Sequence, residues 1–270
     1  MIDVSPFRIE PRTRVDLSDH DPNSKHGFQG KKKDGKRALP ELTQRLMGLQ
    51  RRLWAESAQS LLVVLQAIDT GGKDGTIRHV FRGVNPQGVH VVGFGVPTEE
   101  ELAHDYLWRV HQHTPEDGAI TIFNRSHYED VLVVRVKGLV PEERWSKRYE
   151  HIRSFEKILA DEGTTIVKLF LNISKGEQKE RLKARLNEAD KNWKFSKGDL
   201  DDRALWGDYQ AAFGDAISET STNYAPWYVV PANRKWYRNL VVSSILIETL
   251  EAMDPQYPEP EADLDKVVIT

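Results

Sequence analysis

The sequence predicts an α/β fold with a central parallel sheet of about five strands between layers of helices. Short apolar runs alternate along the chain with stretches of helical periodicity, as in strands joined by right-handed helical crossovers. The first apolar run also ends in a glycine-rich turn, where open parallel sheets bind their ligands. The chain has 270 residues, which is enough for one large domain of this kind.

Composition limits the classes of function. Hydrophobic residues make up 39% of the chain, charged residues make up 29%, and the net charge is −3, as in ordinary globular proteins. The absence of cysteine excludes a disulfide scaffold, thiolate metal ligands and thiol catalysis. The opening MIDVSPFRIE lacks a basic region and an apolar run, so we expect no secretory signal, no membrane association and a cytoplasmic location. The sequence has no recognition-helix signature, so we expect no nucleic-acid binding.

Three segments are expected in order along the chain. Residues 1–38 read as a polar arm, extended or partly ordered, because no period is sustained there. Residues 39–253 form the domain, and residues 254–270 form an acidic, proline-rich tail on the surface. The domain opens with a helix over 40–59, in which leucines recur at spacings of three and four.

The remaining elements follow from the alternation of apolar runs and amphipathic stretches. Strands are expected at 61–68, 89–95, 119–123, 164–171 and 227–230. Helices are expected at 75–83, 98–112, 126–136, 141–161, 176–190, 200–222 and 234–252.

A glycine-rich turn (QAIDTGGKDGT) follows the first strand. It fits the P-loop pattern G-x-x-x-x-G-K-[ST] at Gly72 and Lys73, but Ala67 replaces the first glycine and Asp74 replaces the hydroxyl residue. Glycines let consecutive N–H groups face an anion at the positive end of the next helix, and lysine adds a mobile charge. An ordinary strand-to-helix turn is the alternative. The predicted phosphate-binding residues of this loop are Thr70, Gly71, Gly72, Asp74, Gly75 and Thr76.

Because Asp74 replaces the Ser or Thr of the P-loop pattern, the hydroxyl that usually binds the metal is absent from this loop. In P-loops this hydroxyl holds Mg²⁺, so another group has to take its place. Asp69 or Asp74 could do so, since carboxylate oxygens are ligands that Mg²⁺ prefers.

Polar side chains follow the strand expected at 119–123, at its carboxyl end. Asn124 stands where an acidic metal ligand is usual, and Arg125 can neutralise charge on a transferring phosphoryl group. Glu129 and Asp130 come about one helical turn later and are candidates for holding metal or orienting the acceptor. Alternatively, Ser126 caps a helix and Glu129 completes a capping box, and both roles can coexist.

Four segments resemble family 2 polyphosphate kinases, in order and over about residues 40–250: AIDTGGKDGTIRHVF, GFGVPTEEELAHDYLWRVHQ, FNRSHYEDVLVVRV, and NWKFS, ALWGDY and STNYAPWYVVPANRKWYRN taken together. The resemblance implies a P-loop kinase fold like that of thymidylate kinase, with dependence on Mg²⁺ or Mn²⁺. Asn124, with SHYED beside it, resembles the subgroup that phosphorylates nucleoside mono- and diphosphates. The match places Asp69, Lys73, Arg125, Glu129 and Asp130 at the catalytic centre, with Asp69 and Asp130 as metal ligands.

The resemblance also assigns a lid and an acceptor side. The lid is expected at about 178–200, where Arg181 and Arg185 share a helix face and could bind phosphate. Without the resemblance, an exposed, salt-bridged helix is the preferred explanation of these two arginines. On the acceptor side, the candidate nucleotide-binding residues are Phe94, Pro97, Arg109 and Asn124, with core packing as the alternative for Phe94.

The sequence therefore predicts in-line phosphoryl transfer between inorganic polyphosphate and nucleoside mono-, di- or triphosphates. Two alternatives stay open: an ATP-dependent nucleotide kinase on the same fold, and a module that binds polyphosphate without catalysis. The family resemblance further suggests a homo-oligomer, a tetramer or a dimer.

Overall fold

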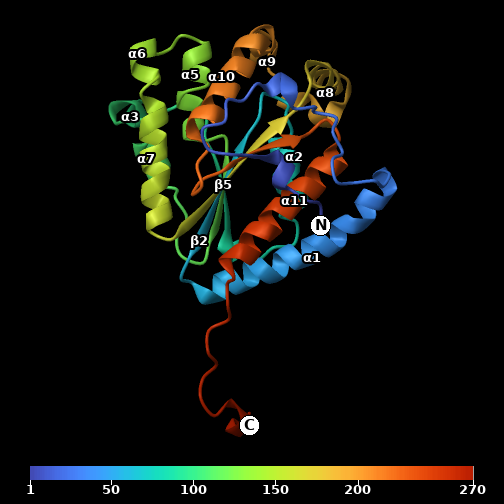
Figure 1. The fold of residues 1–270 in the computed structure, drawn as a ribbon, viewed down its shortest axis with the longest axis vertical. Helices are drawn as coiled ribbons and strands as arrows, with labels where there is room; N and C mark the ends of the chain where they lie inside the picture. The colour runs from blue at the N-terminus through green and yellow to red at the C-terminus, as the bar shows by residue number, and fades with distance from the viewer. Residues whose placement is uncertain (270) are drawn as a thin grey trace.

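A computed structural model describes residues 1–269, and its centre is a six-stranded sheet (Figure 1). The strand order is β1-β6-β5-β2-β4-β3, and every neighbouring pair is parallel except β1 with β6. The predicted α/β fold with five parallel strands is thus confirmed, and an antiparallel edge strand is added. The strands are β1 Arg8–Ile9, β2 Ser60–Gln66, β3 Val89–Gly93, β4 Ile120–Asn124, β5 Thr164–Asn172 and β6 Trp227–Pro231.

Helices cover both faces of the sheet. Figure 1 shows α1 and α11 on one side and α7 and α10 on the other, and each of these pairs is in mutual contact. All seven residues of β2 are buried, which explains why its sequence is continuously apolar rather than alternating. The helices are α1 Lys32–Glu56, α2 Lys73–Val80, α3 Glu99–Ala103, α4 Trp108–His111, α5 Val133–Val136, α6 Glu142–Trp145, α7 Arg148–Asp161, α8 Lys175–Asn187, α9 Gly198–Ala204, α10 Trp206–Thr220 and α11 Lys235–Met253.

Several long helices expected from the sequence are divided in two. The 98–112 stretch becomes α3 and α4, because the Asp105 carboxylate accepts a hydrogen bond from the Leu107 N–H and turns the chain between them. The 126–136 stretch becomes a short 3-10 helix, η4 (His127–Asp130), followed by α5. In the same way α6 and α7 replace one predicted helix, and α9 and α10 replace another. Periodicity alone does not reveal such breaks, since the apolar spacing continues through them.

The first helix begins earlier than predicted. It starts at Lys32, where the Asp34 carboxylate accepts a hydrogen bond from the Lys31 N–H, and it passes through Pro40. The leucine spacing that predicts the helix starts only at Leu42, so it does not extend to this first part, and proline disfavours interior positions of a helix. The helix accommodates it within its first three turns.

The N-terminal segment packs against the domain more closely than an extended, partly ordered arm would. Its apolar side chains are buried, and β1 adds to the edge of the sheet beside β6. The buried side chains are Ile2, Val4, Phe7, Ile9, Val15 and Leu17. After Met253 the chain runs away from the body of the domain, with mostly exposed residues (Figure 1). Within residues 1–269, no helix combines the length and apolar character needed to cross a membrane.

Replacement of Phe7 tests whether this packing stabilises the domain. Phe7 is 5% exposed, and its ring lies 6.5 Å from that of Tyr237 on α11. Phe7→Ala should lower the free energy of unfolding by about 3 to 5 kcal/mol, as for other buried phenylalanines. Urea denaturation would measure the loss. Val96→Ala, at a side chain that is 94% exposed, is the control and should change stability by less than about 0.5 kcal/mol. Equal effects of the two substitutions would contradict the packing role.

Candidate active site

The phosphate loop is a tight bend between β2 and α2. The backbone has positive φ at Thr70 (64°) and Gly72 (102°), and the Gly71 N–H donates to the Ile68 carbonyl over 2.9 Å. A Cβ on Gly71 would lie 2.3 Å from the Cβ of Ala67 and 2.7 Å from the Ile68 oxygen. Only glycine fits there, so the spacing of the two glycines is a steric requirement of the bend.

Lys73 is the first residue of α2, and its side chain turns back over the loop. Its ammonium donates to the Ala67 carbonyl over 3.1 Å. Burial lowers the pKa of Lys73 and Arg125 adds to the effect, whereas the carboxylates of Asp69 and Glu129 oppose it. The lysine therefore lies among both positive and negative groups beside the loop.

Asp69 and Arg125 form an ion pair across the ends of β2 and β4, with 2.6 Å between Oδ1 and Nη2. Burial works against ionisation of Asp69, but Lys73 and Arg125 outweigh it and hold the pKa of this carboxyl below its usual value. Asp69 is therefore ionised at neutral pH. The pair forms because β2 and β4 are adjacent and parallel, with Leu65 opposite Asn124, so their carboxyl ends meet at one edge.

The two carboxylates of η4 have different surroundings. Burial raises the pKa of Glu129, while Arg125 and Lys73 oppose the rise, so Glu129 belongs to the loop side. Asp130 instead accepts hydrogen bonds from Arg148 Nη1 at both its backbone oxygen (2.9 Å) and Oδ1 (3.0 Å). Burial raises the pKa of Asp130 to about 6 despite Arg148. The structure thus brings Glu129 toward the phosphate loop and sets Asp130 against an arginine of α7.

Asp74 connects the loop, the sheet and the predicted lid. Its Oδ1 accepts from Asn124 Nδ2 over 3.0 Å and its Oδ2 from Lys194 Nζ over 2.9 Å. Burial raises the pKa of Asp74, but the bonds from Lys194 and Asn124 outweigh it and lower the pKa overall. The carboxylate missing from position 124 is therefore present one hydrogen bond away, at position 74.

The two arginines of α8 differ in position. Arg181 lies on the loop, where Nη1 donates to the carbonyls of Thr70 (3.0 Å) and Gly71 (2.9 Å). Arg185 instead donates to Asp199 over 2.8 Å and to the Lys194 carbonyl over 3.0 Å, so it joins parts of the 178–200 segment to each other. Arg181 is therefore adjacent to any phosphate on the loop, whereas Arg185 reaches such a phosphate only after releasing Asp199.

The candidate nucleotide-binding residues lie around the end of β3. Phe94 is buried against Phe123, with ring centroids 4.9 Å apart, so it packs in the core. Arg109 stacks on Phe94, with 5.5 Å between the guanidinium carbon and the ring centroid, and donates to the Gly95 carbonyl over 3.1 Å. Pro97 is half-buried in the loop that follows. Phe94 and Arg109 therefore fix the base of this loop.

The chain is similar to known proteins along almost its whole length. The family model for polyphosphate kinase 2 matches residues 29–258. The chain belongs to the polyphosphate kinase 2 family. It is 60% identical to the AMP/ADP-polyphosphate phosphotransferase of Meiothermus ruber over 97% of this chain and 98% of that protein. It is 43% identical to the ADP-polyphosphate phosphotransferase of Rhodopseudomonas palustris over 96% of this chain and 93% of that protein.

A solved structure of the family has the same fold throughout. The crystal structure of polyphosphate kinase 2 from Arthrobacter aurescens superposes with a TM-score of 0.94 at 44% identity, covering 97% of this chain and 93% of that chain. The resemblance noted from the sequence segments is thereby confirmed, and the P-loop kinase fold holds for the chain as a whole.

The structure adds residues to this polyphosphate kinase 2 site that the sequence patterns did not reveal. Arg238 on α11 donates from Nη1 to the Gly72 carbonyl over 3.2 Å, and burial, with Arg181 nearby, lowers its pKa to about 9. Asp202 of α9 pairs with Lys137 over 2.8 Å and borders the small cavity at Asp69. The run NRKWYRN was the available signal for Arg238, but nothing in it indicates which cation turns inward.

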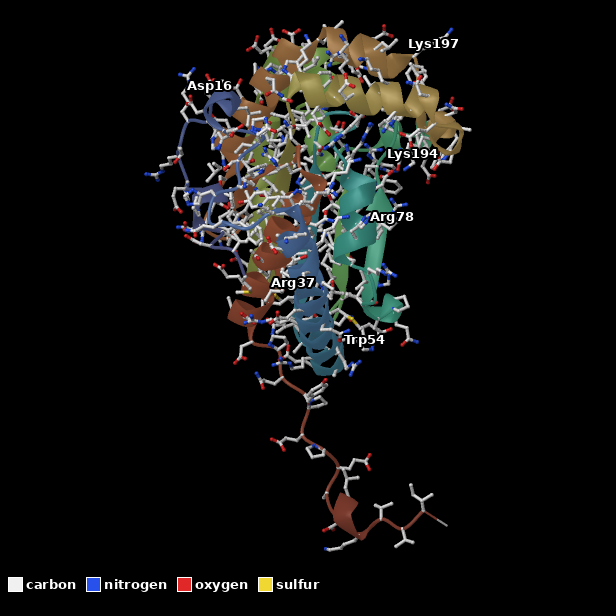
Figure 2. All side chains as sticks on the ribbon, turned by 90° about the vertical axis from the view of Figure 1, so that its right-hand side faces the viewer. Asp16, Arg37, Trp54, Arg78, Lys194 and Lys197 are labelled. Carbon is white, nitrogen blue, oxygen red and sulfur yellow. The ribbon has the colours of Figure 1, made fainter. Side chains whose placement is uncertain are left out.

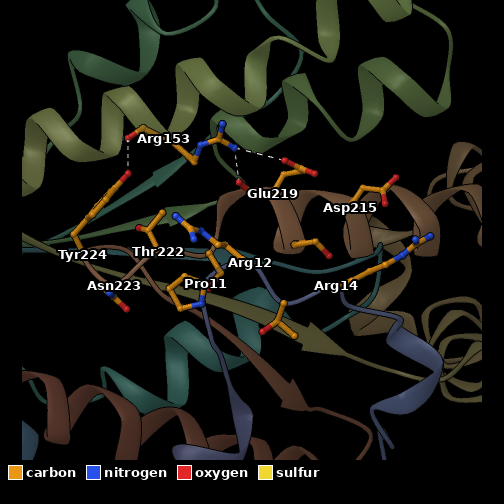
Figure 3. A pocket seen from close by; sticks show the side chains of 12 residues that line it. Pro11, Arg12, Arg14, Arg153, Asp215, Glu219, Thr222, Asn223 and Tyr224 are labelled. Atoms are coloured by element: carbon orange, nitrogen blue, oxygen red, sulfur yellow. Dashed lines mark hydrogen bonds and ion pairs between the residues drawn. The ribbon is translucent and has the colours of Figure 1, made fainter.

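Two hollows in the structure differ in size and chemistry. A cavity of about 30 Å³, lined by Asp69, Arg125, Glu129, Asp202 and Tyr209, holds about one water molecule. A hollow of about 900 Å³ lies where residues 11–14 cross the end of α10 (Figure 3). In it Arg153 donates to the Glu219 backbone oxygen over 2.6 Å and lies 3.7 Å from the Glu219 carboxylate. The smaller cavity is the one that borders the phosphate loop, at Asp69 and Arg125.

The raised pKa of Asp130 predicts a pH-dependent stability. Between about pH 4 and 6 the carboxyl of Asp130 is ionised in the unfolded chain but still protonated in the folded chain. The free energy of unfolding therefore falls as the pH rises across this range. Asp130→Asn removes the titration. The wild-type free energy of unfolding, minus that of the variant, should therefore fall by on the order of 3 kcal/mol between pH 3.5 and 7. Denaturation series in buffer with a metal chelator measure this difference, and a constant difference would contradict the raised pKa.

Proposed function

We propose that this chain is a polyphosphate kinase that transfers a phosphoryl group between inorganic polyphosphate and nucleotides. AMP and ADP are the proposed acceptors, with GMP and GDP as further candidates. The convergence of Lys73, Arg125 and Arg181 on a glycine-lined bend carries the proposal, because such a bend suits a chain of phosphates. The family relatives named as AMP- and ADP-polyphosphate phosphotransferases support the choice of substrates.

A divalent cation, Mg²⁺ or Mn²⁺, fits the donor set. Mg²⁺ in kinases is held by one or two carboxylates together with substrate phosphates. Within residues 1–269 there is no group of three or more carboxylate or imidazole side chains that could hold a metal by themselves, so substrate phosphates would have to complete the ligand set. Asp69 and Asp130 are the predicted ligands, and Asp74 is a third candidate because it is ionised beside Asn124. The metal would neutralise phosphate charge.

The residues of the chain perform the remaining tasks. Lys73 and Arg125 stabilise the charge that spreads over the transferring phosphoryl oxygens. A nucleotide phosphate is already largely ionised at neutral pH, so no general base is needed, and Asp130 with Arg148 orients the acceptor side. The 178–200 segment would close over the reacting phosphates and keep water from hydrolysing them. The cytoplasmic location and the homo-oligomeric state remain predictions.

The donor specificity tests the proposal. The protein is incubated with AMP or ADP and a single donor, either long-chain polyphosphate or ATP, in the presence of Mg²⁺, and the nucleotides are separated by chromatography. We expect phosphorylated nucleotide with polyphosphate. Transfer from ATP alone would establish the nucleotide-kinase alternative, and retention of labelled polyphosphate without transfer would establish the binding-module alternative.

Removal of Lys73 should impair turnover more than binding. Lys73→Ala should lower kcat by roughly 10² to 10³, the range for losing one preorganised contact to a transition state. The same chromatographic assay at saturating polyphosphate measures it. Lys157→Ala, at an exposed lysine of α7 that lies outside both the phosphate loop and the 178–200 segment, is the control and should retain full activity. A Lys73→Ala variant as active as the control would refute the assigned role.

The proposed lid is linked to the phosphate loop through Asp74. Figure 2 shows Lys194 near Arg78 of α2, whereas Lys197 lies farther out on the same segment. Because Lys194 joins the segment to Asp74, Lys194→Ala should favour lid opening and raise hydrolysis of polyphosphate relative to transfer, by roughly threefold to tenfold for a contact of about 1 kcal/mol. Phosphate release and nucleotide formation are measured together. Lys197→Ala is the matched control, and an equal ratio in both variants would contradict the link.

A further inference from the structure

A fully buried polar cluster lies beneath η4, on the opposite side from the phosphate loop. Lys168 of β5 donates to Glu156 of α7 over 2.6 Å, to the Tyr128 hydroxyl over 3.0 Å and to the Thr220 carbonyl over 2.7 Å. The Tyr128 hydroxyl donates to Glu156 over 2.8 Å, and His127 Nε2 lies 3.4 Å from the same carboxylate. All five side chains have zero exposure.

The charge state of the cluster follows from these contacts. Burial opposes ionisation of Glu156, but Lys168 outweighs it and lowers the pKa of this carboxyl, so Glu156 is an acceptor for all three neighbours. Burial lowers the pKa of His127 and keeps it neutral. It raises the pKa of Tyr128 well above the usual value, so the phenol keeps the proton that it donates. Each polar hydrogen pointing at Glu156 is therefore in place at neutral pH.

Stability alone does not account for such a cluster. Two buried charges lose their hydration, and apolar side chains of similar volume are often as stabilising or more so. The cluster does have a specific geometric effect, because its members come from β5, α7, the end of α10 and η4. Tyr128 and His127 are the two residues that precede Glu129 and Asp130 in η4.

We propose that the Lys168–Glu156 pair, acting through Tyr128, is a positioning device that sets the η4 turn and so aims Glu129 and Asp130. The inference rests on the proposed function of these two carboxylates. On the loop side, Ser126 holds the start of the turn by accepting from Gln66 Nε2 (3.1 Å) and from the Tyr128 N–H (3.2 Å). The phenol fixes the other side, since its ring also packs on Trp227 with centroids 4.8 Å apart.

Fixing both sides is needed because the turn is short. η4 has four residues. The Glu129 N–H donates to the Ser126 carbonyl, and the N–H groups of Val131 and Leu132 donate to the Tyr128 carbonyl, each over 3.0 Å. A 3-10 turn of this length has weak hydrogen-bond geometry of its own. Without the anchored phenol, the turn can rotate about the strand end, and a displacement of about 1 Å at reacting groups can cost up to 10²-fold in rate.

The test compares two Tyr→Phe variants that each lose one buried hydroxyl contact. Tyr128→Phe removes the link to Glu156 and Lys168. Tyr237→Phe, at an equally buried residue whose hydroxyl donates to the His26 carbonyl over 2.6 Å, is the matched control. Hydrogen exchange on the substrate-free protein follows the amides of Glu129, Val131 and Leu132. We expect at least about tenfold faster exchange of these amides in Tyr128→Phe alone, since local opening no longer breaks the phenol contacts.

Kinetics supply the functional readout. kcat for transfer from polyphosphate should fall by roughly tenfold or more in Tyr128→Phe, with KM for polyphosphate within about twofold of wild type. Lys168→Met, a second variant of similar volume, should reproduce this pattern. In an Asp130→Asn, Glu129→Gln background, Tyr128→Phe should have little further effect on kcat, because the turn then has no carboxylate to aim.

The outcomes separate the two proposals. Unchanged exchange at η4 in Tyr128→Phe, or equal changes in both tyrosine variants, overturns the positioning role whatever the reaction is. Faster exchange together with an unchanged kcat also overturns it, because the turn would then move without consequence. Absence of transfer by the wild-type protein would instead reject the proposed function, while the exchange result would still decide whether the cluster holds the turn.

Discussion

The bend that the chain makes after β2 is the constraint on which the arrangement of the site depends. It exists because Gly71 packs its backbone against Ala67 and Ile68 more closely than any side chain allows. The bend starts α2 directly at the end of the strand and turns Lys73 back over the loop. Groups from β4, α8 and α11 then converge on the same few residues, although they are far apart in the sequence.

The way in which the cations are held explains why the site stays attractive to a polyanion. Arg238 donates to a backbone carbonyl and to the amide oxygen of Asn239, and Arg181 donates to the loop carbonyls as well as to Glu177. The carbonyl and amide oxygens orient these guanidinium groups without cancelling their charge, whereas the Glu177 carboxylate partly neutralises Arg181. The chain as a whole has a net charge of −3, so attraction for polyphosphate arises from this local arrangement rather than from bulk charge.

The sequence predicted those parts of the molecule whose signal is local. The strands β2, β4, β5 and β6 appear as apolar runs, because a strand covered on both faces has no polar side to show. The loop and the tip of β4 were visible because each is a short motif at the end of a run. The edge strand β1 was missed, since two residues carry no period, and the burial of Phe7 depends on Tyr237, some 230 positions later. Helix breaks such as that at Asp105 depend on a single side-chain bond.

For the candidate site residues, too, the sequence predicted what depends on a local motif and not what depends on contacts between distant residues. Lys73 and Arg125 lie beside the loop as their motifs implied, and each also meets charges of the other segment: Arg125 pairs with Asp69, and Glu129 acts on Lys73. Phe94 shows the limit most clearly. Its place after a strand is compatible with nucleotide contact or with core packing, since the sequence pattern does not distinguish the two directions of a side chain at a strand end. The structure packs its ring on Phe123.

Two separate sets of hydrogen bonds, here called frames, hold the two sides of the bend: one includes Asp74 and Lys194, and the other includes Tyr128 and Glu156. Asp74 ties the loop to the lid through Lys194, at a partly exposed position where a salt bridge is weak and easily exchanged. Tyr128 ties η4 to a pair of charges that no water reaches, where breaking one contact leaves the other charge without its partner. The exposed frame suits a part that must open for each substrate, and the buried frame suits a part that must stay fixed. The contacts on the two sides of the bend thus differ in burial, and the proposed function assigns the exposed contact to the lid and the buried one to the turn that carries the carboxylates.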